Sequence, residues 1–213
     1  MSDRAAFVVG VTGHRPNRLA IGGDAILARL TTALRASKYA SRGSELVALS
    51  ALAEGSDRLF AQTALALGFR LHALLPFASV WYETTFSEPG TTDAYHGLLA
   101  RAARVEELPG TLADSPAAYE AMGHIIVARA DVMIAIWDGK PSAGRGGTPE
   151  IIEHALSHGV PGIWIDAARD RKPRLLRPSL VQGRPVVRET VLTRSRLVRL
   201  SRLRRRGAKS TMA

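Results

Sequence analysis

Short apolar runs that each end in a small polar cluster alternate with helical segments along most of this 213-residue chain. Three of the runs, at 7–11, 45–52 and 131–137, come before the most distinctive clusters. Those clusters are Thr12-Gly13-His14-Arg15-Pro16, Glu54-Gly55-Ser56-Asp57 and Gly146-Gly147-Thr148-Pro149-Glu150. Buried strands separated by helices form parallel sheets with right-handed crossovers. The pattern therefore predicts an α/β fold, a Rossmann-like, doubly wound and mostly parallel sheet with helices on both faces.

Hydrophobic spacing and turn residues predict the remaining elements. Asp24 is expected to cap a helix whose Ile26, Leu30, Ala33 and Leu34 face inward, and Gly68 is expected to end a helix that begins at Ser56 or Asp57. The other expected elements are strands at 69–75 and 160–165 and helices at 92–104, 116–129 and 149–158.

The net charge of +10 is distributed unevenly along the chain. Residues 169–213 carry 15 Lys and Arg against 2 Asp and Glu, which leaves 14 basic and 17 acidic side chains in residues 1–168. We therefore expect one nucleotide-binding domain over 1–168 and a basic C-terminal tail over 169–213, partly helical or disordered. Arginines that alternate with leucines after residue 191 fit a basic amphipathic helix on nucleic acid or an anionic membrane, and they also fit a solvated linker.

Composition excludes several classes of site and of protein. The chain has no cysteine, so thiol nucleophiles, disulfides and cysteine metal sites are excluded, and we expect no metal and no required cofactor. Neither a signal-peptide pattern at the N-terminus nor an apolar run of about 18 residues is found. We therefore expect a cytoplasmic protein.

Because ligands of such sheets bind at the carboxyl ends of the strands, the three clusters predict one anion-binding crevice there. Gly146, Gly147 and Thr148 open a helix whose N-terminus attracts a phosphate, although the same residues also fit an ordinary capped turn. Glu150 lies in the first turn, where an acidic residue is expected from the helix dipole alone.

The other two clusters offer further groups for an anion. Ser56 and Asp57 begin a second helix after small residues, and they are equally explained as capping residues. His14 and Arg15 follow the first strand, where a guanidinium binds phosphate well, and a histidine packed over the strand end beside a surface arginine is the alternative.

In order and spacing, the three clusters, the Pro76-Phe77 turn and the run from Asp131 to Gly139 resemble the SLOG superfamily over roughly residues 6–166. That superfamily includes DNA processing protein A, the lonely-guy phosphoribohydrolases, YpsA-like proteins and bacterial nucleotide sensors. The resemblance implies a Rossmann-like domain that binds a nucleotide or an ADP-ribose-like ligand. It also implies a bacterial type of protein that forms homo-oligomers, with an effector contact through its tail.

The resemblance also implies which residues bind the ligand. Trp81 and Tyr82 would stack on a base, although a loop anchored on the core explains them as well. Tyr119 and Asp138 would lie at the rim of the pocket. The full set implied for the ligand site is Gly13, His14, Arg15, Gly55, Ser56, Asp57, Trp81, Tyr82, Tyr119, Asp138, Gly146, Gly147, Thr148 and Glu150.

Two departures from the superfamily bear on chemistry. The phosphoribohydrolases pair the glutamate that matches Glu150 with an upstream arginine, and the stretch 120–124 contains none. DNA processing proteins carry an arginine where this chain has Glu54, and an acid disfavours a phosphate backbone. We therefore expect ligand binding or sensing without catalysis. The alternatives are a nucleoside 5′-monophosphate phosphoribohydrolase that uses Glu150, and a nucleic-acid or membrane-binding protein that uses its tail.

Overall fold

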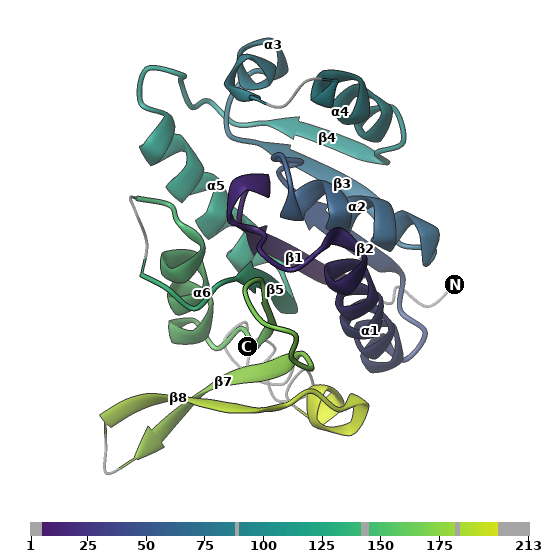
Figure 1. The fold of residues 1–213 in the computed structure, drawn as a ribbon, viewed down its shortest axis with the longest axis vertical. Coiled ribbons are helices and arrows are strands. Elements are labelled where there is room, and N and C mark those ends of the chain that lie inside the picture. Colours follow the sequence, from purple (N-terminus) through teal and green to yellow (C-terminus); the bar gives the residue numbers. More distant parts are fainter. Residues whose placement is uncertain (1–5, 88–89, 142–144, 182–183, 200–213) are drawn as a thin grey trace, which may run out of the picture.

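A single eight-stranded sheet with helices on both faces organises the chain (Figure 1). The computed structural model describes residues 6–87, 90–141, 145–181 and 184–199. The strands are β1 (Phe7–Gly13), β2 (Leu46–Ser50), β3 (Arg70–Leu75), β4 (Arg104–Glu107), β5 (Val132–Trp137), β6 (Gly162–Asp166), β7 (Arg174–Val181) and β8 (Arg184–Val191). The α-helices are α1 (Gly23–Ser41), α2 (Ser56–Ala66), α3 (Ser79–Tyr82), α4 (Thr91–Leu99), α5 (Ser115–Arg129) and α6 (Thr148–Ser157).

The strand order is β4-β3-β2-β1-β5-β6-β7-β8, and the pairs from β4 to β6 are parallel. The chain builds outward from β1 to β4 and then returns to the other side of β1 as β5. The order therefore reverses between β1 and β5, and this reversal opens a crevice at the carboxyl ends of these strands. The predicted α/β fold with a Rossmann-like, mostly parallel sheet is confirmed.

Helices cover the two faces of the sheet separately. Ile26, Leu30 and Phe60 of α1 and α2 pack in one hydrophobic cluster, whereas Ile126 of α5 and Ile152 of α6 pack in the other. Successive residues of a strand point to opposite faces, so β1 contributes to both clusters. No helix in the described part of the chain combines the length and the apolar character that a bilayer span requires.

The part of the chain that was expected to be a basic tail differs most from the prediction. β7 pairs antiparallel with β6, and β8 pairs antiparallel with β7, so residues 174–191 extend the sheet and are not a separate tail. Residues 194–199 are helical, which was one of the alternatives for this segment, and Leu197 is buried. The arginine-rich residues 200–213 lie outside the described residues.

Two other elements also differ from the prediction. The helix expected over 92–104 ends at Leu99, and Arg104–Glu107 forms the edge strand β4 instead. The helix expected to be capped by Asp24 begins at Gly23, with Gly22 at its N-cap, so Asp24 lies in the first turn. The remaining expected helices and strands agree with the structure to within a few residues.

Two glycines in left-handed conformations provide a test of the packing between β1 and α2. Gly55 has φ +83°, and a Cβ there would lie 2.9 Å from the carbonyl oxygen of His14. Gly68 has φ +84°, and a Cβ there would meet no atom within 4 Å. We expect Gly68→Ala to lower the unfolding free energy by about 1–2 kcal/mol, the cost of the backbone conformation alone. Gly55→Ala should cost roughly 3 kcal/mol or more, because φ +83° with ψ −116° strongly favours glycine and the side chain also pushes against His14 and Pro16, just after β1.

Urea denaturation of both variants measures the difference. Equal losses in the two would show that the loop before α2 is not held against the end of β1.

Candidate functional site

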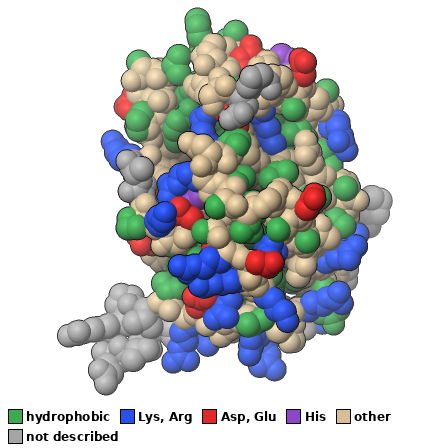
Figure 2. Space-filling view, in the orientation of Figure 1, with side chains coloured by type: hydrophobic (Ala, Val, Ile, Leu, Met, Phe, Trp, Pro, Cys, Tyr) green, Lys and Arg blue, Asp and Glu red, His purple; other side chains and the backbone are tan. Residues whose placement is uncertain are grey.

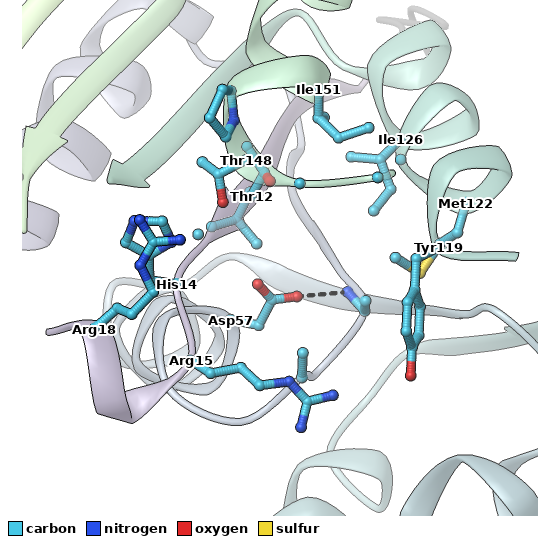
Figure 3. Close-up of a pocket in the computed structure, with 18 of the residues that line it drawn as sticks. Thr12, His14, Arg15, Arg18, Asp57, Tyr119, Met122, Ile126, Thr148 and Ile151 are labelled. Atoms are coloured by element: carbon cyan, nitrogen blue, oxygen red, sulfur yellow. Dashed lines mark hydrogen bonds between the residues drawn. The ribbon is translucent and has the colours of Figure 1, made fainter. Parts of the chain in front are cut away.

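A cavity of about 360 Å³ lies at the carboxyl ends of β1 and β2, beside the first turn of α6 (Figure 3). It occupies the crevice where the strand order reverses, and its volume is typical of small-molecule sites. Its lining is formed by Val11, Thr12, Gly13, His14, Arg15, Asn17, Arg18, Ala51, Ala53, Asp57, Tyr82, Tyr119, Met122, Gly123, Ile126, Arg145, Gly146, Gly147, Thr148, Pro149 and Ile151.

The first turn of α6 forms one wall of the cavity. Gly147 is the N-cap of this helix with extended backbone angles, Thr148 is buried, and Pro149 occupies the first turn, where a missing N–H costs nothing. The backbone N–H groups of Gly147 and Thr148 form no hydrogen bond with any other described residue. The N–H of Gly146, in contrast, donates to the carboxylate of Glu150 at 2.8 Å. This wall therefore offers main-chain donors and the positive end of a helix dipole.

His14 connects the end of β1 to the loop after β5. Its Nε2 donates to Oδ1 of Asp138 at 3.0 Å, and Arg18 donates to the other carboxylate oxygen at 2.9 Å. Burial raises the pKa of Asp138, but the hydrogen bonds from His14, the backbone of Lys140 and Arg18 outweigh it and hold that pKa well below its usual value. Asp138 is thus ionised, and it keeps the proton of His14 on Nε2.

Ser56 holds α2 against β1. Both its backbone N–H and its hydroxyl donate to the carbonyl oxygen of His14, at 3.2 and 2.8 Å. Gly13 is needed where the two segments meet, because a Cβ there would lie 2.5 Å from Cβ of Ser56. Gly55 and Ser56 therefore lie against the backbone just after β1, and neither lines the cavity.

Arg15 lies on the cavity wall with its charge partly neutralised. Its guanidinium donates to Glu54 at 3.0 Å and to the carbonyl oxygen of Thr85 at 3.0 Å. The Glu54 carboxylate is 1% exposed and also accepts the N–H of Ser87, whereas Arg15 remains 38% exposed. Glu54 therefore positions Arg15 and does not itself face the cavity, so an acid at this position does not repel an anion directly.

Asp57 is the one Asp or Glu among the lining residues. It belongs to the first turn of α2, and its Oδ2 accepts hydrogen bonds from the Ser50 hydroxyl at 3.2 Å and the Ala51 N–H at 3.1 Å. Asp57 therefore stabilises the turn between β2 and α2, in which the buried Leu52 has φ +58°. Burial raises the pKa of this carboxyl to about 6, although the hydrogen bonds oppose the shift.

Apolar and aromatic side chains also line the cavity. They are Met122 and Ile126 of α5, Ile151 of α6 and the rings of Tyr82 and Tyr119. Tyr82 is 1% exposed and makes an edge contact with Tyr119, with ring centroids 6.4 Å apart. Figure 3 shows the Tyr119 ring on the side of the cavity away from His14 and Arg18.

The structure brings together most of the residues that the sequence singled out, but not all of them. Gly13, His14, Arg15, Asp57, Tyr82, Tyr119, Gly146, Gly147 and Thr148 line the cavity. Trp81 is 58% exposed and outside the lining, and Glu150 is exposed and bonded to Gly146. Asp138 is also outside the lining, and it accepts hydrogen bonds from His14, Arg18 and the backbone of Lys140. A direct ligand contact of Trp81, Glu150, Gly55, Ser56 or Asp138 is therefore not supported by their placement.

Two arginines of the lining were not predicted from the sequence. Arg18 lies three residues after Arg15 in a short helical turn that begins at Pro16, and Arg145 precedes the glycines before α6 and pairs with Glu120. Their nearness to predicted site residues was a usable signal. The apolar residues of α5 gave no such signal. The described residues contain no group of three His, Asp or Glu side chains arranged to hold a metal ion.

No protein-family model matches the chain, and a search of curated proteins also gave no match. Solved structures that are similar include TM1055, a structural genomics target, with 16% identity, a TM-score of 0.46, and coverage of 73% of this chain and 72% of that one. DNA processing protein A from Streptococcus pneumoniae has 16% identity and a TM-score of 0.47 over 74% of this chain and 50% of its own.

DNA processing protein A from Helicobacter pylori, described for its single-stranded DNA binding mode, has 18% identity and a TM-score of 0.46 over 74% of this chain and 64% of its own. The similarity is low, so the function has to be argued from the cavity itself.

The raised pKa of Asp57 predicts how stability depends on pH. The folded protein binds a proton at this carboxyl near pH 6, whereas the unfolded chain does so near 3.8, so the group destabilises the fold above pH 6 and this cost is relieved as the pH falls. Between pH 7 and pH 4, wild-type protein should gain about 2–3 kcal/mol of unfolding free energy relative to Asp57→Asn. Denaturant unfolding of both proteins at each pH measures the difference, and a constant difference would contradict the raised pKa.

Proposed function

We propose that the cavity binds a nucleotide or a nucleotide-derived ligand, without catalysis. The observation that carries the proposal is that groups able to bind an anion and apolar groups line the same cavity. Arg15, Arg18, Arg145 and the backbone N–H groups of Gly147 and Thr148, which bond to no other described residue, share the lining with Met122, Ile126, Ile151, Tyr82 and Tyr119. A ligand that combines phosphates with a flat base matches this mixed lining.

Charge in the lining also supports an anionic ligand. Three arginines and one carboxylate, that of Asp57, line the cavity, and protonation of Asp57 near pH 6 would remove this negative charge. The acids paired with the arginines lie outside the lining, so the arginines present donors to the cavity although their charges are largely balanced. Arginine binds phosphate through two parallel N–H groups, and amides at a helix N-terminus add further donors without the entropy cost of ordering a side chain.

Hydrolysis of the base–ribose bond receives no support from the placement of Glu150. Its carboxylate is exposed, accepts the N–H of Gly146 and lies outside the cavity lining. A group that assists bond cleavage has to come within hydrogen-bond distance of the reacting atoms. We therefore propose binding or sensing as the role of the cavity.

Two substitutions at Gly147 test the anion site with little risk to the fold. Aspartate and asparagine are both good N-cap residues, and Gly147 has φ −70°, which either residue adopts easily. Gly147→Asp adds a negative charge where the phosphate is proposed to bind, whereas Gly147→Asn adds a side chain of the same size without charge. We expect calorimetry with AMP, ADP, ADP-ribose and a cyclic dinucleotide to detect binding, and Gly147→Asp to weaken it at least about tenfold more than Gly147→Asn.

Thermal melts of both variants check that the helix is retained. Failure of all four ligands to bind, or equal affinities of the two variants, would refute the proposal.

A further inference from the structure

A groove between α1 and the segments around β7 and β8 forms a second concave surface. It has a volume of about 500 Å³ and is lined by Ala25, Ala28, Arg29, Thr32, Asp170, Arg171, Lys172, Pro173, Val191 and Leu192. None of these residues lines the cavity described above. The groove, which we call the α1 groove, is therefore a separate site.

The wall of the α1 groove continues along α1 to an exposed aromatic ring. Ala25, Ala28 and Thr32 line the groove, and Arg35 and Tyr39 follow at the same helical spacing of three and four residues. Tyr39 is 59% exposed, and the guanidinium carbon of Arg194 lies 5.7 Å from its ring centroid. An exposed ring with a cation beside it is thus placed at the end of this face.

Positive charge predominates around the groove. Between residues 169 and 199 the chain has ten Lys and Arg but only Asp170 and Glu189 as acids, and these two are paired with Arg29 and Arg174. Figure 2 shows Lys and Arg side chains gathered over the end of the molecule where Figure 1 places α1, β7 and β8. Exposed Lys and Arg side chains of α1 and of residues 169–199 include Arg35, Arg169, Arg171, Lys172, Arg188, Arg194, Arg196 and Arg199.

We propose that the α1 groove binds single-stranded nucleic acid, with a base stacked on Tyr39 and phosphates held by Arg35, Lys172 and Arg194. A charged groove that follows a backbone, combined with an exposed aromatic ring, is the arrangement by which proteins bind single strands. A duplex keeps its bases stacked inside and offers none to Tyr39. A flat bilayer surface does not enter a concave groove, so charge alone would not place a membrane there.

Anisotropy of a fluorescein-labelled 20-nucleotide oligothymidylate, titrated with the full chain, tests the proposal. Tyr39→Ala should weaken binding at least about fivefold, the lower end of the effect of one stacked base. Trp81→Ala is the matched control, because Trp81 is equally exposed, at 58%, but lies on α3 and far from the groove in the fold. It should leave the affinity unchanged.

A second pair of variants tests the charge. Arg35→Glu and Arg101→Glu both reverse an exposed arginine, but Arg101 lies in the short connection between α4 and the edge strand β4. We expect Arg35→Glu alone to weaken binding and to make the logarithmic dependence on salt shallower, by about 0.7 for each lost phosphate contact or slightly more. Thermal melts of all four variants confirm that they are folded.

Three outcomes would overturn the proposal: no loss of affinity in Tyr39→Ala, a duplex that binds as tightly as the single strand, or binding only to vesicles of phosphatidylcholine and phosphatidylserine. Tyr39→Ala would also keep the wild-type affinity if residues 200–213 alone bound the oligonucleotide, and that result would overturn the proposal as well. Gly147→Asp should bind the oligonucleotide with the same affinity as wild-type protein. Failure of the proposal for the α1 groove can therefore be distinguished from failure of the proposal for the cavity.

Discussion

His14 is the residue on which the arrangement of the site depends, because its backbone and its side chain fix three different segments. Its N–H donates to Ile136 of β5, its carbonyl oxygen accepts both donors of Ser56 at the start of α2, and its imidazole donates to Asp138. Hydrogen bonds of this kind are worth only about 1 kcal/mol each, but breaking one leaves a buried polar group unsatisfied. The crevice at the strand reversal is therefore built as one unit.

The same network explains which parts of the site were predictable. Glycine and small polar residues after apolar runs located the loops correctly, because parallel strands bring their carboxyl ends to one edge. The directions of the side chains of Ser56 and Asp138 were not predictable, because they depend on contacts distant in sequence. Ser56 bonds to His14, 42 residues away, and Asp138 also bonds to His14, 124 residues away. Glu150 shows that a contact close in sequence can also decide the direction, because its carboxylate accepts the N–H of Gly146, four residues away, and lies outside the cavity lining.

The fold was predictable where burial sets the pattern and less so at the edges of the sheet. Ile26, Leu30, Ala33 and Leu34 are all fully buried, as their helical spacing indicated. β4, with the sequence Arg-Val-Glu-Glu, lies at an edge and is largely exposed, so no apolar run marks it. β7 and β8 each contain a proline, which is typical of strands near an edge and which made this basic segment resemble a linker.

Charge is organised differently in the cavity and in the α1 groove, and this difference bears on how each would select a partner. Around the cavity, Arg15, Arg18 and Arg145 are each paired with an acid, so little net field extends into solvent and the direction of each donor determines what binds. Around the groove, exposed cations outnumber acids and attract any polyanion over a distance set by the salt concentration. Affinity at the groove should therefore depend steeply on salt, whereas affinity in the cavity should depend mainly on the shape of the ligand.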